Sequence, residues 1–128
     1  MYKLFYVAAG GALGASLRYG VSLLTLRLGS PAFPWGTLAV NLIGSFVAGF
    51  IWAILDQTTG DQRNHAFFII GVCGAFTTFS AYALESLYLL QNGQSGLAVT
   101  NVLANNAGSL LAVFAGFTLA KWIFHQAQ

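Results

Sequence analysis

The chain has 128 residues, of which 57% are hydrophobic and only 6% are charged. About a quarter of the residues of an ordinary soluble domain are charged, and five Lys/Arg with three Asp/Glu cannot cover the surface of one. The composition therefore predicts an integral membrane protein. The net charge of +2 includes no basic run that could follow a phosphate backbone, which excludes nucleic acid as a direct partner.

Hydropathy and turn residues predict a single four-helix transmembrane domain over residues 1–128, with four spans separated by three short breaks. Each span is long enough to cross a hydrocarbon core of about 30 Å at about 1.5 Å per residue. The breaks hold prolines and a glycine, the two aspartates, and a polar turn, respectively. The expected spans cover residues 4–28, 35–55, 66–90 and 97–121, and the breaks cover 29–34, 56–65 and 91–95.

Small residues recur three or four positions apart within the spans. This spacing lets helix backbones approach closely, which drives association where the hydrophobic effect cannot. The sequence therefore predicts tightly packed helices, with close contacts at Gly10, Gly14 and Ala15, at Gly44, Ala48 and Gly49, and at Gly108, Ala112 and Ala115.

The basic residues are nearly balanced between the two sides of the expected bundle. Four spans place both termini and the 56–65 break on one side, which then carries Lys3, Arg63 and Lys121. The other side carries Arg27, with Arg18 nearby. This weak asymmetry allows both orientations in the membrane, and the assembly that we expect from it is an antiparallel two-fold dimer.

Two polar stripes run along the second and fourth spans. Polar groups inside a membrane are costly, so they are paired or functional. One interpretation is interhelical hydrogen bonding, and the other is a lined pathway. A cation route usually has acidic rings, whereas amides, hydroxyls and aromatic edges suit an anion. The stripes consist of Thr37, Asn41 and Ser45, and of Asn101, Asn105 and Ser109.

The middle of the third span is poor material for a continuous helix. Two glycines precede two β-branched threonines in the segment 71–85. We expect a break there, since irregular backbone at membrane depth is tolerated where its carbonyls find partners or line a wet cavity. The alternative is a continuous helix whose Ser and Thr hydroxyls bond to preceding carbonyls.

Four blocks of sequence, one in each span, resemble the Fluc, or CrcB-type, fluoride channels. These blocks are GGALGASLRY (10–19), WGTLAVNLIGSFVAG (35–49), GVCGAFTTFSAYALE (71–85) and NNAGSLLA (105–112). The resemblance implies a dual-topology antiparallel homodimer of four-helix subunits in the lipid of the cell inner (plasma) membrane. It also implies two pores that export fluoride passively from the cytoplasm, and a central structural sodium ion.

The resemblance further implies roles for individual residues. The fluoride pathway would be formed by Asn41 as a donor, the Phe79 and Tyr82 rings, a polar track of Thr37, Ser80 and Glu85, and Asn105 and Ser109 on the fourth helix. Arg18 would lie near a vestibule, and the backbone carbonyls of Gly74 and Thr77 would bind the sodium ion.

Three positions depart from the family pattern. Tyr82 replaces the usual second phenylalanine, Ala81 replaces a polar residue, and Val113 replaces a hydroxyl-bearing residue. The changes at Ala81 and Val113 reduce the number of polar groups in the polar track. A heterodimer with a paralogue is therefore an alternative to the homodimer.

Other functional classes fit the sequence less well. A small multidrug exporter would share four spans and dual topology, but it would need a glutamate in the first span, which has none. A structural membrane subunit would explain the small residues but not the aligned donors. We expect no enzyme, because no nucleophile with a base, no carboxylate pair and no metal cluster is evident. Cys73 is expected to be a buried hydrophobe, and His65 and His125 are expected to be solvated.

Overall fold

The computed structural model describes residues 2–28, 32–57 and 61–125, and these described residues are helical apart from short connections. The long helices are α1 (Tyr2–Leu28), α2 (Trp35–Gln57), α5 (Phe79–Gln91) and α6 (Ser95–His125). Three shorter segments precede α5, namely α3 (Gln62–Asn64), the π-helical η1 (His65–Cys73) and α4 (Gly74–Phe76). Among the described residues, four stretches are long and apolar enough to cross a membrane: Tyr2–Arg27, Trp35–Asp56, Gln62–Gln91 and Ser95–Phe124.

The third stretch begins at Gln62, four residues before the start expected from the sequence. The reason is a local cap, because the Asp61 side chain accepts a 3.0 Å hydrogen bond from the Arg63 amide and satisfies a free N–H at the helix start. The predicted 56–65 break is correspondingly shorter, and its residues 58–60, like residues 29–31 of the first break, lie outside the described residues.

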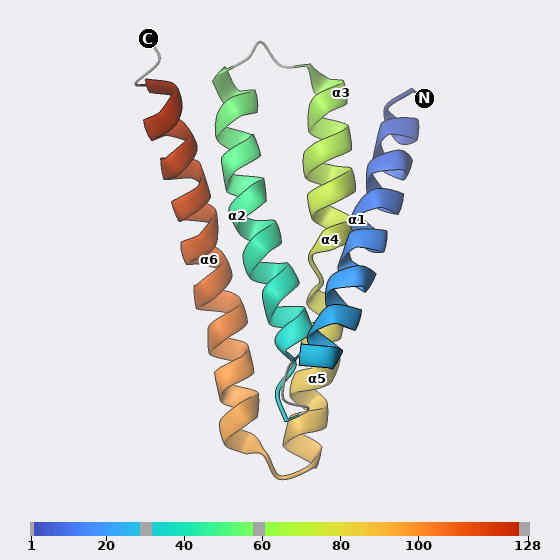
Figure 1. Cartoon of the computed structure of the whole chain (residues 1–128), viewed down its shortest axis with the longest axis vertical. Helices are drawn as coiled ribbons and strands as arrows, with labels where there is room; N and C mark the ends of the chain where they lie inside the picture. The colour runs from blue at the N-terminus through green and yellow to red at the C-terminus, as the bar shows by residue number, and fades with distance from the viewer. Residues whose placement is uncertain (1, 29–31, 58–60, 126–128) are drawn as a thin grey trace.

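The start of α1, the end of α2, the start of α3 and the end of α6 lie at one end of the bundle (Figure 1). The end of α1, the start of α2 and the α5–α6 turn lie toward the other end. The α5–α6 turn is the predicted polar turn. Gly93 has a φ of 72°, and the amide of Gln94 donates to the Leu89 carbonyl at 2.9 Å. This is a glycine-terminated helix end, in which a left-handed residue allows the last carbonyls to be satisfied.

Glycines bring two pairs of helices into backbone contact. A methyl group on Gly10 of α1 would collide with the Phe67 carbonyl oxygen of η1, and one on Gly71 would lie 2.9 Å from the Gly10 Cα. Between α2 and α6, a methyl group on Gly116 would collide with the Phe46 carbonyl oxygen. The close approach predicted at Gly10 is therefore present, and the predicted Gly49 also makes one, since a methyl group there would collide with the Val113 carbonyl oxygen.

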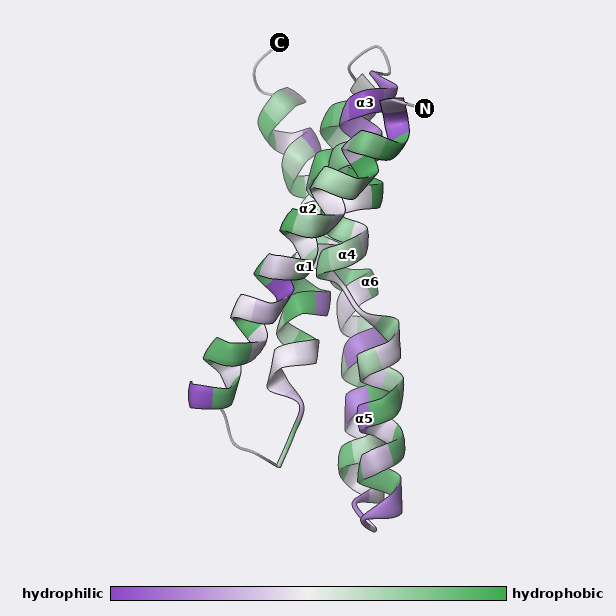
Figure 2. Cartoon of the chain, turned by 90° about the vertical axis from the view of Figure 1, so that its right-hand side faces the viewer, coloured by the Kyte–Doolittle hydropathy of each residue, from purple (hydrophilic) through white to green (hydrophobic). Residues whose placement is uncertain are grey.

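The α1–α2 pair and the α5–α6 pair diverge toward the end opposite the termini, and hydrophilic residues lie at both ends of the bundle and at a few places between them (Figure 2). Large apolar side chains remain exposed along the sides, including Leu4, Leu26, Leu84 and Leu111. An apolar outer surface of this kind is what lipid requires.

Candidate functional site

The backbone between α4 and α5 is not helical. Thr77 has φ −77° and ψ 159°, and Thr78 has φ −147° and ψ 124°, so both are extended. Helical structure resumes at Phe79, where the Thr78 hydroxyl caps α5 by accepting a 3.3 Å hydrogen bond from the Ala81 amide. Two consecutive β-branched residues favour this extended geometry.

Asn41 of α2 binds the extended segment through both atoms of its amide group. Its Oδ1 accepts from the Thr78 N–H at 2.8 Å, and its Nδ2 donates to the Thr78 carbonyl at 3.0 Å. In an uninterrupted helix the Thr78 N–H would instead donate to the Gly74 carbonyl. Similarly, the Ala81 N–H that caps on Thr78 would donate to the Thr77 carbonyl. In a continuous helix, the Thr78 and Ala81 N–H groups would bind the Gly74 and Thr77 carbonyls. At the extended segment they bind the Asn41 and Thr78 side chains instead.

A chain of buried amides continues from Asn41 across the bundle. Asn41 Nδ2 donates to Asn105 Oδ1 at 2.8 Å, and Asn105 Nδ2 donates to Asn101 Oδ1 at 2.8 Å and to the Asn101 carbonyl at 3.0 Å. Asn101 Nδ2 then donates to Ser86 Oγ of α5 at 3.0 Å. These side chains connect α2, α5 and α6, and they satisfy polar groups that would be costly to bury alone.

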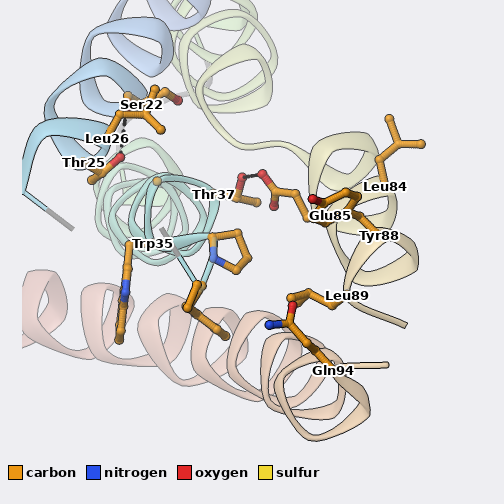
Figure 3. Close-up of a pocket in the computed structure, with 14 residues that line it drawn as sticks. Ser22, Thr25, Leu26, Trp35, Thr37, Leu84, Glu85, Tyr88, Leu89 and Gln94 are labelled. Carbon is orange, nitrogen blue, oxygen red and sulfur yellow. Dashed lines mark hydrogen bonds between the residues drawn. The ribbon is translucent and has the colours of Figure 1, made fainter. Parts of the chain in front are cut away.

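Thr37 and Glu85 meet across the diverging end of the bundle. The Thr37 hydroxyl donates to Glu85 Oε1 at 2.7 Å, and both residues line a cavity of about 950 Å³ (Figure 3). The second carboxylate oxygen of Glu85 is buried without a hydrogen-bond partner among the described residues. Arg18 of α1 lines an adjoining cavity of about 310 Å³ together with Thr37, Thr78 and Glu85. The structure thus brings Arg18 beside the polar pair.

The two predicted aromatic rings lie together at the start of α5. The centroids of Phe79 and Tyr82 are 5.2 Å apart, with their planes at 67°, an edge-to-face arrangement. Phe79 is 75% exposed and projects from the subunit surface. The Tyr82 hydroxyl accepts a hydrogen bond from Asn106 Nδ2 at 3.0 Å, so it points toward α6.

The remaining predicted site residues lie around this group. Gly74 and Ser80 are exposed and Thr77 and Ser109 are partly buried. A methyl group on Gly74 would meet no atom closer than the Ile69 carbonyl oxygen at 3.6 Å, so the space beside it is open in the subunit. The Thr77 hydroxyl donates to the Cys73 carbonyl at 3.0 Å.

Three contacts were not assigned from the sequence: Asn101 as an interior partner, Ser86 as its acceptor, and Asn106 as the partner of Tyr82. Asn101 does belong to the polar stripe with four-residue spacing, which is the signal for it. The contact between Tyr82 and Asn106 joins two helices at a separation of 24 residues, for which the sequence carries no periodic signal.

Comparison with known proteins places these residues in a family context. Residues 5–117 match the family model described as CrcB-like protein, Camphor Resistance (CrcB). A protein of Parabacteroides distasonis named fluoride-specific ion channel FluC is 44% identical over 94% of this chain and 94% of its own length. A Rhizobium meliloti protein of the same name is 44% identical over 94% of this chain and 98% of its own.

A third relative with that name, from Legionella pneumophila, is 43% identical over 95% of this chain and 93% of its own length. The names of all three describe ion channels and not enzymes. The family match covers most of the residues that form the polar and aromatic site, from Arg18 to Ser109. With its four apolar helices, the chain is a multi-pass membrane protein, and it belongs to the CrcB-like family.

Proposed function

We propose that this chain is a fluoride-selective passive ion channel that exports fluoride from the cytoplasm across the cell inner membrane. The observation that carries the proposal is the group of hydrogen-bond donors and aromatic edges gathered at the interruption between α4 and α5, in a chain whose relatives are named for fluoride. Such groups present partial positive charge to an anion without holding it as a fixed cation would.

The functional unit in this proposal is an antiparallel homodimer with two pores. Phe79 supports it because its ring is 75% exposed at the subunit surface, where a second copy can cover it. The near balance of basic residues across the membrane supports insertion in both orientations. Reporter fusions at the C-terminus should report both orientations in one membrane, and a single orientation would contradict the antiparallel homodimer.

A central sodium ion fits the donor chemistry of the interruption. The Gly74 and Thr77 carbonyls have their usual helical donors diverted to Asn41 and Thr78, and unwound backbone carbonyls are typical sodium ligands in membrane proteins. The ion would supply a positive charge that ties together carbonyls from the two subunits. The open space beside Gly74 leaves room for this approach.

The anion path in this proposal runs past the rings and the polar residues. Both hydrogens of the Asn41 amide already bind acceptors, namely the Thr78 carbonyl and Asn105 Oδ1. A fluoride ion at Asn41 therefore takes over one of these two hydrogen bonds. Beyond it, Arg18 lines the same cavity as Glu85, and in this proposal its positive charge offsets the negative charge of that carboxylate in the path of an anion.

Reconstitution into liposomes loaded with fluoride tests the proposal. Fluoride should leave rapidly when a potassium ionophore balances its charge, and chloride should not. Phe79→Ile removes a ring edge at constant bulk and should reduce the efflux steeply, whereas Phe5→Ile, at a ring that is also exposed but lies near the N-terminus, should not. Coupled transport of an organic cation, or no release at all, would contradict the channel and favour an exporter or a structural subunit.

A further inference from the structure

The amide chain that ends on Asn41 begins at Asn101, which is completely buried. A fully buried asparagine far from water is retained only where its polar atoms are satisfied. Here the Oδ1 atom accepts from Asn105 and the Nδ2 atom donates to Ser86. The Asn101 side chain is therefore held in one orientation, and this favours one orientation of the Asn105 amide.

The orientation of each amide in the chain follows from that of the preceding one. Asn105 Nδ2 donates both to Asn101 Oδ1 and to the Asn101 backbone carbonyl, so Asn105 presents its own Oδ1 to Asn41. Asn41 Nδ2 is then directed at Asn105 and the Thr78 carbonyl, which leaves Asn41 Oδ1 facing the Thr78 N–H. A reversed Asn105 amide would instead point its NH₂ group at the NH₂ group of Asn41, with two donors opposed.

We propose that Asn101 is a positioning residue that acts through Asn105 and Asn41 to hold the Thr78 N–H away from the Gly74 carbonyl. The Asn101 side chain on α6, which does not contact the interruption before α5, thus helps to maintain it together with the two threonines. The consequence for fluoride flux and sodium rests on the proposed function, but the effect on the Thr78 peptide does not.

Ser86 closes the far end of the chain. Its hydroxyl accepts from Asn101 and donates to the Tyr82 carbonyl at 2.8 Å. The chain therefore joins the N-cap of α5, Thr78, to Ser86 within α5 through α2 and α6. Removal of Ser86 Oγ takes one partner from Asn101 but leaves its contact with Asn105, so its effect should be in the same direction and smaller.

The test compares amide hydrogen exchange at Thr78 in the reconstituted full chain, with threonine labelled for NMR. Asn101→Leu keeps a similar shape and removes both side-chain contacts of residue 101, while its backbone carbonyl still accepts from Asn105. Thr78 should then exchange faster by up to roughly tenfold, the size expected from one lost buried hydrogen bond. Ser86→Ala should accelerate exchange less. Thr100→Val is the matched control, since this exposed hydroxyl bonds to the Gly96 carbonyl of its own helix, and it should leave Thr78 unchanged.

A second measurement separates positioning from loss of folded protein. The sodium concentration that gives half-maximal fluoride efflux should rise in Asn101→Leu, whereas a merely smaller folded fraction would lower the maximal efflux at constant half-saturation. Unchanged Thr78 exchange in folded Asn101→Leu, or equal acceleration by Thr100→Val, would overturn the inference. If Asn101→Leu does not assemble, the Ser86→Ala comparison with Thr100→Val decides. Absence of fluoride efflux in the unmodified chain would refute the proposed function and leave the exchange result standing.

Discussion

The two ends of the bundle are held together by different kinds of contact. Toward the termini, α1 meets η1 and α2 meets α6 through glycines that place one backbone directly on another. Toward the opposite end, the helices diverge around a cavity of about 950 Å³, and the hydrogen bond from Thr37 to Glu85 is a contact that joins α2 to α5 there. The interruption at Thr77 and Thr78 lies between the two regions.

The two ends of this chain, which has few charges, thus differ in how far their contacts can change. Backbone contact between small residues cannot adjust, because any added atom meets a carbonyl. Hydrogen bonds between side chains can exchange partners, which an ion pathway requires. We therefore expect substitutions in the glycine contacts to affect assembly and substitutions near the interruption to affect transport.

The largest effect on stability is expected from Gly10→Ala. The added methyl group collides with the Phe67 carbonyl oxygen, and overpacking of this kind costs about 1–3 kcal/mol of stability. Thermal unfolding in detergent should show a large loss of folded protein. Gly11→Ala is the matched control, because a methyl group there meets nothing within 4 Å in the subunit; equal losses for the two variants would refute the assignment of this contact.

Asn41→Asp should abolish fluoride efflux from liposomes while the glycine contacts persist. The carboxylate faces two acceptors, the Thr78 carbonyl and Asn105 Oδ1, and it repels a passing anion. At an effective dielectric constant of 20, two like charges 4 Å apart repel by about 4 kcal/mol, so efflux should fall by at least roughly a hundredfold. Asn92→Asp at the exposed α5–α6 turn introduces the same charge and should have little effect; efflux retained in Asn41→Asp would place the path elsewhere.

Tyr82→Phe should change fluoride efflux by no more than about threefold, since the hydroxyl is engaged with Asn106 and the ring edge is kept. Asn106 keeps its 2.7 Å hydrogen bond to the Val102 carbonyl. A change of tenfold or more in the same efflux assay would mean that the hydroxyl itself contacts the ion.

The smallest effect is expected at Asp61, outside the membrane-spanning stretches. The hydrogen bond from the Arg63 backbone amide, followed by the contact with the Arg63 side chain, lowers the pKa of this carboxyl. A carboxyl whose pKa is lower in the folded chain stabilises it above the unfolded pKa, and this contribution disappears as the pH falls through the folded value. Thermal unfolding of Asp61→Asn should therefore differ slightly from that of the unmodified chain at pH 7, and this difference should shrink as the pH is lowered into the acid range; the reverse trend would argue against the cap.

The composition and residue spacing of the sequence determined that this is a membrane protein, how many spans it has and which helix faces pack. The scarcity of charge required a membrane, the run lengths required four spans, and the spacing of Gly10 and Gly14 identified a face that a neighbouring helix could approach. The stripe spacing also placed Asn41 and Asn105 on helix faces turned inward, because residues four apart share one face. These features depend on neighbours within one helix.

Only the tertiary structure decided which polar groups bind one another. Each asparagine amide can donate or accept in several directions, so the sequence could not reveal that Asn41 binds the Thr78 peptide or that Asn101 sets the chain leading to it. The orientation of Tyr82 toward Asn106 likewise depends on how α5 and α6 pack. Hydrogen bonds between distant segments form only after the helices have packed. One of them, from the Thr78 N–H to Asn41, takes the place of the helical hydrogen bond to the Gly74 carbonyl.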